Sequence, residues 1–243
     1  MKNSLVLISL LPIGFMASVT TGAVTGNQTN SDPYKSVVHD RHGESPCDSF
    51  QLESLLPADG SAGDEFGISV ALSDKTALIG AYKDRNGSSA NTGSAYIFEQ
   101  GSDGKWTETT KLVASDFASD DRFGLCVDLT GDMALIGVYQ NDDNGLTSGS
   151  AYVFQRQMDG QWLESIKLLP SDGIEGDGFG ASVSISSSIA IVGAPFADPA
   201  GTSSGSAYVF IRSDDGNWIE SAKLTASDAD GGDYFGFSVA IMG

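Results

Sequence analysis

"GDGFGASVSISSSIAIVGAP", residues 176–195, carries a Phe-Gly pair near its start and Gly-Ala-Pro at its end, with an apolar, Ser-rich segment between them. The Phe-Gly pair returns along the chain at a nearly constant interval. Its copies begin at Phe66, Phe123, Phe179 and Phe235, which are 57, 56 and 56 residues apart. A period this regular indicates an array of one repeated supersecondary unit.

Each unit contains four short segments in the same order. In the third copy they are FGASVSI, IAIVGAP, GSAYVFIR and NWIESAKLT. Segments rich in Val, Ile, Tyr, Phe and Trp that are bounded by Gly, Asp, Asn and Ser are predicted to be β-strands. An Asp-Gly pair separates the third segment from the fourth, which predicts a tight primed hairpin turn between antiparallel neighbours. These pairs are Asp103-Gly104, Asp159-Gly160 and Asp215-Gly216.

The apolar residues of the second and third segments are consecutive, so both faces of the small sheet are expected to be covered. The fourth segments are more mixed. Trp162, Glu164, Ile166 and Leu168 are expected to share one face of an outer, more exposed strand. A four-stranded sheet that is buried on both faces is typical of a propeller blade.

The sequence therefore predicts an all-β fold, an open arc of a β-propeller. It has three complete four-stranded blades, at about residues 66–113, 123–169 and 179–225, and partial blades at both ends. Residues 50–57 resemble an outer strand, and residues 235–243 supply an inner one. These strands are too few to close a ring. We expect a truncated part of a larger propeller, whose open blade edge could support self-association.

These segments resemble FG-GAP repeats, the blade unit of the seven-bladed propeller of integrin α chains and of many secreted or surface proteins of microbes. The resemblance runs from about Leu52 to Gly243, although only Gly193-Ala194-Pro195 completes the second half of the motif. Many family blades carry a calcium loop of the Asp-x-Asp-x-Asp-Gly type between the first two strands. Here that connection is only three or four residues with at most one carboxylate, so those calcium sites are not expected.

Other acidic residues recur in the pattern Asp-x4-Asp-x-Phe-Gly, before each new inner strand. They could form a cation site at each blade junction. The favoured interpretation is that each Asp caps its own turn by accepting backbone N–H bonds. If calcium binds as a cofactor, the candidate ligands are Asp116, Asp121, Asp228, Asp230 and Asp233.

Residues 1–23 have the pattern of a secretory signal peptide, residues 24–49 that of a polar linker, and residues 50–243 form the repeat array. The mature chain is therefore expected to be secreted or on the cell surface, without membrane insertion. Lys and Arg total 13 against 32 Asp and Glu, a net charge of −19, which would repel nucleic acid and anionic membranes.

Two modifications are open from the sequence. Export would permit a disulfide between Cys47 and Cys126, but Cys126 stands where sister segments carry Ser, which favours a small buried residue. Asn27 and Asn86 fit the pattern of glycosylation acceptors.

The chain is expected not to be an enzyme. Its two histidines, His39 and His42, precede the repeats, so no Ser-His-Asp arrangement can form within the array. The acids recur symmetrically, unlike a catalytic pair with separated pKa values. We expect an exported binding or adhesion module for a protein or carbohydrate ligand. Its contacts would come from variable loops at residues 86–92, 144–148 and 199–204. The alternatives are an accessory propeller of a larger secreted hydrolase or surface receptor, and a purely structural repeat.

Overall fold

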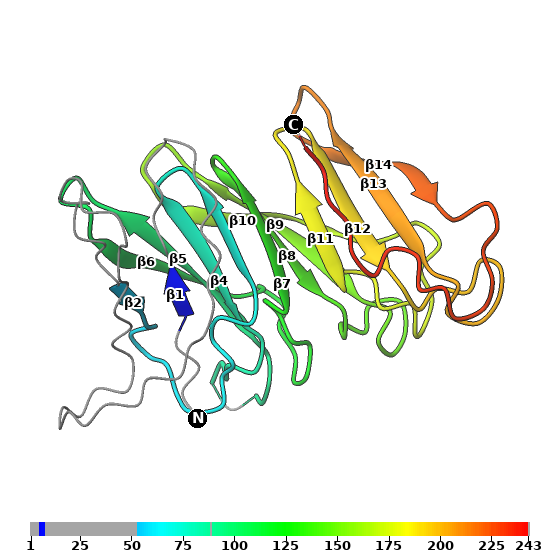
Figure 1. The fold of residues 1–243 in the computed structure, drawn as a ribbon, viewed down its shortest axis with the longest axis horizontal. Coiled ribbons are helices and arrows are strands. Elements are labelled where there is room, and N and C mark those ends of the chain that lie inside the picture. The colour runs from blue at the N-terminus through cyan, green and yellow to red at the C-terminus, as the bar shows by residue number, and fades with distance from the viewer. Residues whose placement is uncertain (1–4, 8–52, 88, 243) are drawn as a thin grey trace, which may run out of the picture. The chain divides into compact units, whose positions relative to one another are not determined.

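The computed structural model describes residues 5–7, 53–87 and 89–242 (Figure 1). All regular elements in these ranges are strands, and none of the described residues forms an apolar helix of membrane-spanning length. Residues 53–243 and 1–6 belong to one compact unit, and residues 7–52 to a second, of which only Leu7 is described. The predicted signal peptide and linker therefore lie almost wholly outside the described residues.

Three antiparallel sheets of four strands each make up the array, and in each sheet the strands are paired in chain order. The first comprises β3 (Val70–Ser73), β4 (Thr76–Ala81), β5 (Ser94–Gln100) and β6 (Trp106–Leu112). The second comprises β7 (Cys126–Thr130), β8 (Met133–Val138), β9 (Ser150–Arg156) and β10 (Trp162–Leu168). The third comprises β11 (Ser182–Ile185), β12 (Ile189–Ala194), β13 (Ser206–Arg212) and β14 (Trp218–Leu224). A separate pair joins β1 (Leu5–Leu7) to β2 (Glu53–Leu55).

These sheets are blades that follow one another in chain order without closing into a ring (Figure 1). The predicted all-β arc of three complete blades is confirmed. The buried faces are confirmed too, because all six residues of β4 and all six of β8 are buried. The predicted outer strand at residues 50–57 contains β2, which pairs with β1 and with no described blade.

The hairpin turns between the third and fourth strands differ from the prediction. Only the glycine of each Asp-Gly pair has a positive φ, as in Gly104 at 81°. Gly104 N–H donates to the Gly101 carbonyl at 3.0 Å, and Gly101 N–H donates to the Lys105 carbonyl at 2.8 Å. The loop is therefore a type I turn followed by a left-handed glycine, not a two-residue primed turn. The Asp103 carboxylate favours this geometry by accepting the Lys105 N–H at 3.1 Å.

The outer strands also contain a bulge that the sequence pattern did not predict. In β10 the register shifts between Glu164 and Ile166, so that Ser165 is an extra residue and the side-chain alternation reverses there. Trp162 packs toward the first blade, whereas Ile166 and Leu168 pack toward the third. The prediction that all of these residues share one face is therefore wrong.

Blades meet through backbone-to-backbone contact between glycines. A Cβ added to Gly137 on β8 would lie 2.0 Å from the carbonyl oxygen of Gly180, which belongs to the next Phe-Gly pair. The same carbonyl accepts the Cys126 thiol at 2.9 Å. At the other two junctions, Ser69 and Ser182 donate equivalent hydroxyl bonds. The glycines of both halves of the motif therefore recur because a side chain at either place would separate the blades.

The phenylalanine of each pair fills the junction. Phe179 is fully buried, and its ring centroid lies 5.5 Å from Tyr208 and 6.0 Å from Phe210 in edge-on contacts. The outer face of the third blade lacks such a neighbour. Leu224 there is 41% exposed, whereas the corresponding Leu112 and Leu168 are each 2% exposed.

The fourth copy begins as predicted and then departs from it. Phe235 forms a parallel bridge with Gly205. The earlier junctions have equivalent bridges, between Phe123 and Gly93 and between Phe179 and Gly149. Residues 237–242 nevertheless form no strand. The segment runs beside the third blade, where Ile241 N–H donates to Ser184 Oγ at 3.2 Å (Figure 1).

Candidate functional site

One end of the blades carries all the long loops. The antiparallel order places the β4–β5, β8–β9 and β12–β13 loops there, together with the connectors between blades (Figure 1). We call this surface the loop rim. Its loops are residues 82–93, 139–149 and 195–205, and its connectors are residues 113–125, 169–181 and 225–236. The short hairpins lie at the opposite end.

Backbone hydrogen bonds tie each rim loop to the following connector. Asp120 N–H donates to the Ala90 carbonyl at 2.9 Å, and Arg122 N–H donates to the Asn91 carbonyl at 3.1 Å. The next two junctions repeat the second bond, from Gly178 and from Tyr234, each at 3.0 Å. The variable loops predicted as contact surfaces are therefore held on the scaffold by the same short ladder in every blade.

Asn86, a candidate glycosylation acceptor, is engaged inside its loop. Its Nδ2 donates to Thr92 Oγ1 at 2.8 Å and to the Gly93 carbonyl at 2.9 Å. This nitrogen is the atom that would carry a glycan, so modification of the folded chain would require these bonds to break. The other candidate, Asn27, lies outside the described residues, and both assignments stay predictions.

The first Asp of three of the four acidic pairs binds a tyrosine and a lysine of the blade that it precedes. Asp116 accepts the Tyr152 hydroxyl at 2.6 Å and the Lys167 ammonium at 2.8 Å. Burial alone would raise the pKa of Asp116, but the hydrogen bonds from Lys167 and Tyr152 outweigh it and lower that pKa. Asp59 and Asp172 make equivalent contacts.

The second Asp of each pair caps its own turn. Asp121 Oδ2 accepts the Ala118 N–H at 2.7 Å, and Asp233 Oδ2 accepts the Asp230 N–H at 2.7 Å. Asp64 and Asp177, in the first and third pairs, cap their turns in the same way. Burial raises the pKa of Asp121. The interpretation as a turn cap is therefore confirmed for the second Asp of each pair. It is wrong for Asp59, Asp116 and Asp172, which accept bonds from side chains instead.

The five candidate calcium ligands belong to two different connectors. Asp116 and Asp121 lie in residues 113–125, and Asp228, Asp230 and Asp233 lie in residues 225–236. Within the ranges that the structure describes, no group of three or more His, Cys, Asp or Glu side chains is arranged to hold a metal. Lys167 already neutralises Asp116. Calcium binding by any of these five residues stays a prediction.

Arg122 forms a cluster on the loop rim that the sequence analysis did not single out. Its guanidinium carbon lies 5.7 Å from the ring centroid of Tyr82 and 6.0 Å from that of Tyr139. One terminal N–H donates to the Tyr139 hydroxyl at 2.9 Å. The buried Nε has no acceptor in the described structure. The two tyrosines come from the loops of consecutive blades, so the cluster lies at a junction.

The backbone position of Arg122 is unusual. Arg122 immediately precedes a Phe-Gly pair and has a φ of 62°, as Glu65 and Tyr234 at the same position have 58° and 54°. Left-handed geometry costs a non-glycine residue about 1–2 kcal/mol. The N–H bond from this position to the preceding loop holds the conformation. At Arg122 the side chain projects between the neighbouring rim loops that carry Tyr82 and Tyr139.

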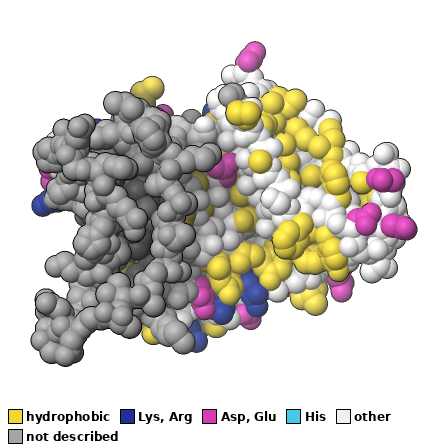
Figure 2. All heavy atoms as spheres, in the orientation of Figure 1, with side chains coloured by type: hydrophobic (Ala, Val, Ile, Leu, Met, Phe, Trp, Pro, Cys, Tyr) yellow, Lys and Arg dark blue, Asp and Glu magenta, His cyan; other side chains and the backbone are white. Residues whose placement is uncertain are grey.

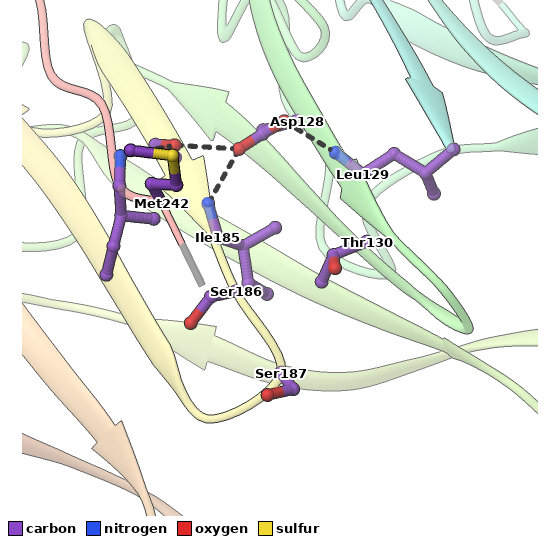
Figure 3. A pocket seen from close by; sticks show the side chains of 9 residues that line it. Asp128, Leu129, Thr130, Ile185, Ser186, Ser187 and Met242 are labelled. Carbon is purple, nitrogen blue, oxygen red and sulfur yellow. Dashed lines mark hydrogen bonds between the residues drawn. The ribbon is translucent and has the colours of Figure 1, made fainter. Parts of the chain in front are cut away.

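A second candidate is a groove of about 510 Å³ between the inner strands of the second and third blades (Figure 3). Asp128 lies on its floor, where one carboxylate oxygen accepts Ser184 Oγ at 2.8 Å and Ile185 N–H at 2.7 Å. The other oxygen accepts the Leu129 N–H at 2.9 Å. One oxygen of Asp128 thus joins two blades, and the other accepts a bond from its own strand, β7. Met242, at the edge of the described chain, forms part of one wall.

Asp128 was missed because it departs from the repeat: Ala71 and Ser184 occupy its position in the first and third copies, and a comparison of the copies would have found it. Arg122 gave no such signal, because Glu65, Gly178 and Tyr234 at its position show that this residue differs in every copy.

Of the two cysteines that could form a disulfide, Cys47 and Cys126, the structure describes only Cys126. Cys126 is a free thiol, and burial raises its pKa to about 12. Cys47, His39 and His42 lie outside the described residues. The interpretation of Cys126 as a small residue in a serine position agrees with its contact to the Gly180 carbonyl.

Comparison with known families agrees with the geometry. A model of the FG-GAP repeat matches residues 50–98, 106–154, 162–210 and 218–243. Each complete match runs from an outer strand to the third strand of the next blade, so one sequence repeat spans one junction. A search of curated protein sequences found no match to the chain. Four matched repeats, covering most of the sequence, show that the chain belongs to the FG-GAP repeat family.

Proposed function

We propose that the chain is an exported, non-enzymatic binding or adhesion module that contacts a protein or carbohydrate ligand through the loop rim. FG-GAP repeats form propeller-type modules that typically bind or adhere. The observation that carries the proposal is the construction of the rim itself. Loops of different sequence are fixed by the same backbone ladder in every blade, which presents variable side chains on a rigid scaffold.

The contacts of the acidic residues support a non-catalytic role. In each of the three blades the first acid is paired with a lysine and a tyrosine, and the second caps a turn. These repeated contacts stabilise connectors, whereas acid–base catalysis needs one asymmetric pair with separated pKa values. The family is also typically non-catalytic.

An accessory role in a larger secreted hydrolase or surface receptor is the second candidate. The outer face of the third blade favours it, because Leu224 is exposed there while the equivalent Leu112 and Leu168 are buried. A further domain, or the open blade edge of a second copy, would cover this apolar surface.

The test is binding of the purified chain to immobilised glycans and matrix proteins, with two matched variants. Leu146 on the loop rim is 62% exposed, and Met158 in the β9–β10 hairpin of the same blade is fully exposed. We expect Leu146→Ser to weaken retention and Met158→Ser to leave it unchanged. Retention that neither variant changes, or that only Met158→Ser weakens, would contradict the proposal.

A further inference from the structure

We propose that Arg122, held between Tyr82 and Tyr139, is the recognition site for a carboxylate side chain of a peptide segment in a protein ligand. This inference rests on the proposed function and names the ligand chemistry of the same surface. It follows from the pairing of the chain's cations, the geometry of the cluster and the exposed apolar side chains of the same loop rim.

Arg122 has no carboxylate partner, unlike most of the other partly buried cations of the described chain. Arg212 is a second exception, and its terminal nitrogens donate to Gln155 Oε1 and Met133 Sδ instead. Lys111, Lys167 and Lys223 each bind an Asp, Lys83 binds Glu65, and Arg156 binds Glu99. In a chain with a net charge of −19, acids are abundant. Yet within the described ranges Arg122 has only the Tyr139 hydroxyl as a side-chain hydrogen-bond partner. Its charge is therefore available to an external anion.

The cluster orients the guanidinium before any ligand arrives. Two tyrosine rings flank it, and the bond to Tyr139 fixes one terminal nitrogen. A planar guanidinium held in this way can donate two parallel N–H bonds to one carboxylate. A lysine ammonium cannot reproduce this bidentate geometry. Because the orientation is set in advance, less side-chain entropy is lost on binding.

The charges around the cluster do not cancel it. Glu65 contacts Lys83, whose ammonium lies 5.2 Å from the Tyr82 ring centroid. Asp120 accepts the side-chain amide of Asn91 at 2.7 Å, and Asp121 is buried as a turn cap. Arg122 and the exposed Arg85 are thus the cations of this junction that no described acid neutralises, and of the two only Arg122 is held between tyrosine rings. Figure 2 shows cationic, acidic and hydrophobic side chains next to one another at the lower edge of the drawn face.

Exposed apolar side chains on the same rim favour a peptide over a sugar acid. A sugar needs several hydrogen-bonding groups around its hydroxyls, whereas protein interfaces combine arginine and tyrosine anchors with apolar neighbours. The exposed apolar residues of the loop rim are Phe117, Leu146, Ile174, Phe196 and Tyr234. An acidic residue flanked by apolar residues is therefore the complementary sequence.

The test compares two immobilised peptides that differ in one group. Both carry Gly-Ser flanks, around Leu-Asp-Phe in one and around Leu-Asn-Phe in the other, and binding of the whole chain is measured by biolayer interferometry. We expect at least a tenfold preference for the Asp peptide. Arg122→Gln should reduce the preference to less than twofold, and Arg122→Lys should leave it intermediate. The control is Arg156→Gln, at the hairpin end of β9 and away from the loop rim, which should leave the preference for the Asp peptide unchanged.

Arg122→Glu keeps the test decisive if the glutamine variant folds poorly. Glutamate already occupies this backbone position in the first blade, at Glu65 with a φ of 58°. We expect Arg122→Glu to retain the wild-type melting temperature within a few degrees and to prefer a Leu-Lys-Phe peptide over Leu-Asp-Phe. Circular dichroism melting of each variant accompanies the binding data.

Equal binding of the Asp and Asn peptides by the wild type would overturn the inference. So would an acid preference that survives Arg122→Gln, or retention of a polyglucuronate polymer through Arg122 with no retention of the Asp peptide. If the chain binds glycans or matrix proteins through Leu146 while it ignores both peptides, the proposed function stands and this inference fails. If the rim variant Leu146→Ser has no effect on any ligand, the proposed function fails separately.

Discussion

Substituting Gly137 with alanine tests how the blades are joined. The added Cβ would lie 2.0 Å from the Gly180 carbonyl oxygen, whereas ordinary contact begins near 3.4 Å, so the junction must open by about 1.4 Å. Both partners are backbone, and no side-chain rotation relieves the overlap. Overpacking of this kind costs about 3 kcal/mol. For a domain of this size, that predicts a melting temperature lower by roughly 6–12 °C in thermal unfolding followed by circular dichroism.

Gly231→Ala is the matched control. Its Cβ would meet nothing closer than 3.4 Å, and Gly231 has no positive φ, so the change carries neither overlap nor backbone strain. We expect its free energy of unfolding to stay within about 0.5 kcal/mol of the wild type. If Gly137→Ala melts within about 2 °C of the wild type, the blades are not joined by glycine-to-glycine contact and the reasoning is refuted.

Three further predictions concern the polar contacts of the blades. Ser206→Ala should stabilise the chain by about 1 kcal/mol in urea unfolding, because Ser206 Oγ is buried without a partner; a lower midpoint would contradict this. The folded-state pKa of Asp116 lies below its ordinary 3.8, so its stabilising effect is present above that pH and is lost as the pH falls through the lower folded-state value. Lys167→Met should therefore lower the urea midpoint at pH 7 and flatten its fall toward about pH 3, and a parallel pH profile would refute the pairing. Excess calcium or chelator should move the melting temperature by less than about 1 °C, and a larger rise with calcium would establish a metal site in the connectors.

Much of the fold could be predicted because the same local sequence pattern recurs in every repeat. The strand segments, their order and their burial follow from apolar runs bounded by turn residues, and each copy supports the others. The turn type and the bulge could not be predicted in this way. The bulge at Ser165 depends on pairing with β9, and the left-handed glycine of the hairpin depends on a third loop residue that propensity alone does not count.

The candidate site was only partly accessible from the sequence. The loops of the rim were predicted from their variation, and the turn-capping acids from their spacing to Phe-Gly. The partners of Asp116 were not predicted, although Tyr152 and Lys167 recur in every blade at the same interval and could have been matched to it. Arg122 was missed because its significance comes from two tyrosines of different blades, which only the three-dimensional structure brings together.

The most direct test of the account is hydrogen exchange of the chain alone and bound to the glycan or matrix protein that it retains. The proposed function predicts slower exchange at rim amides in residues 85–92, 142–147 and 198–204 when the ligand is bound. It predicts no change in the hairpins at residues 101–105, 157–161 and 213–217. Protection confined to those hairpins, or to the groove around Ser184, would show that the loop rim is not the contact surface.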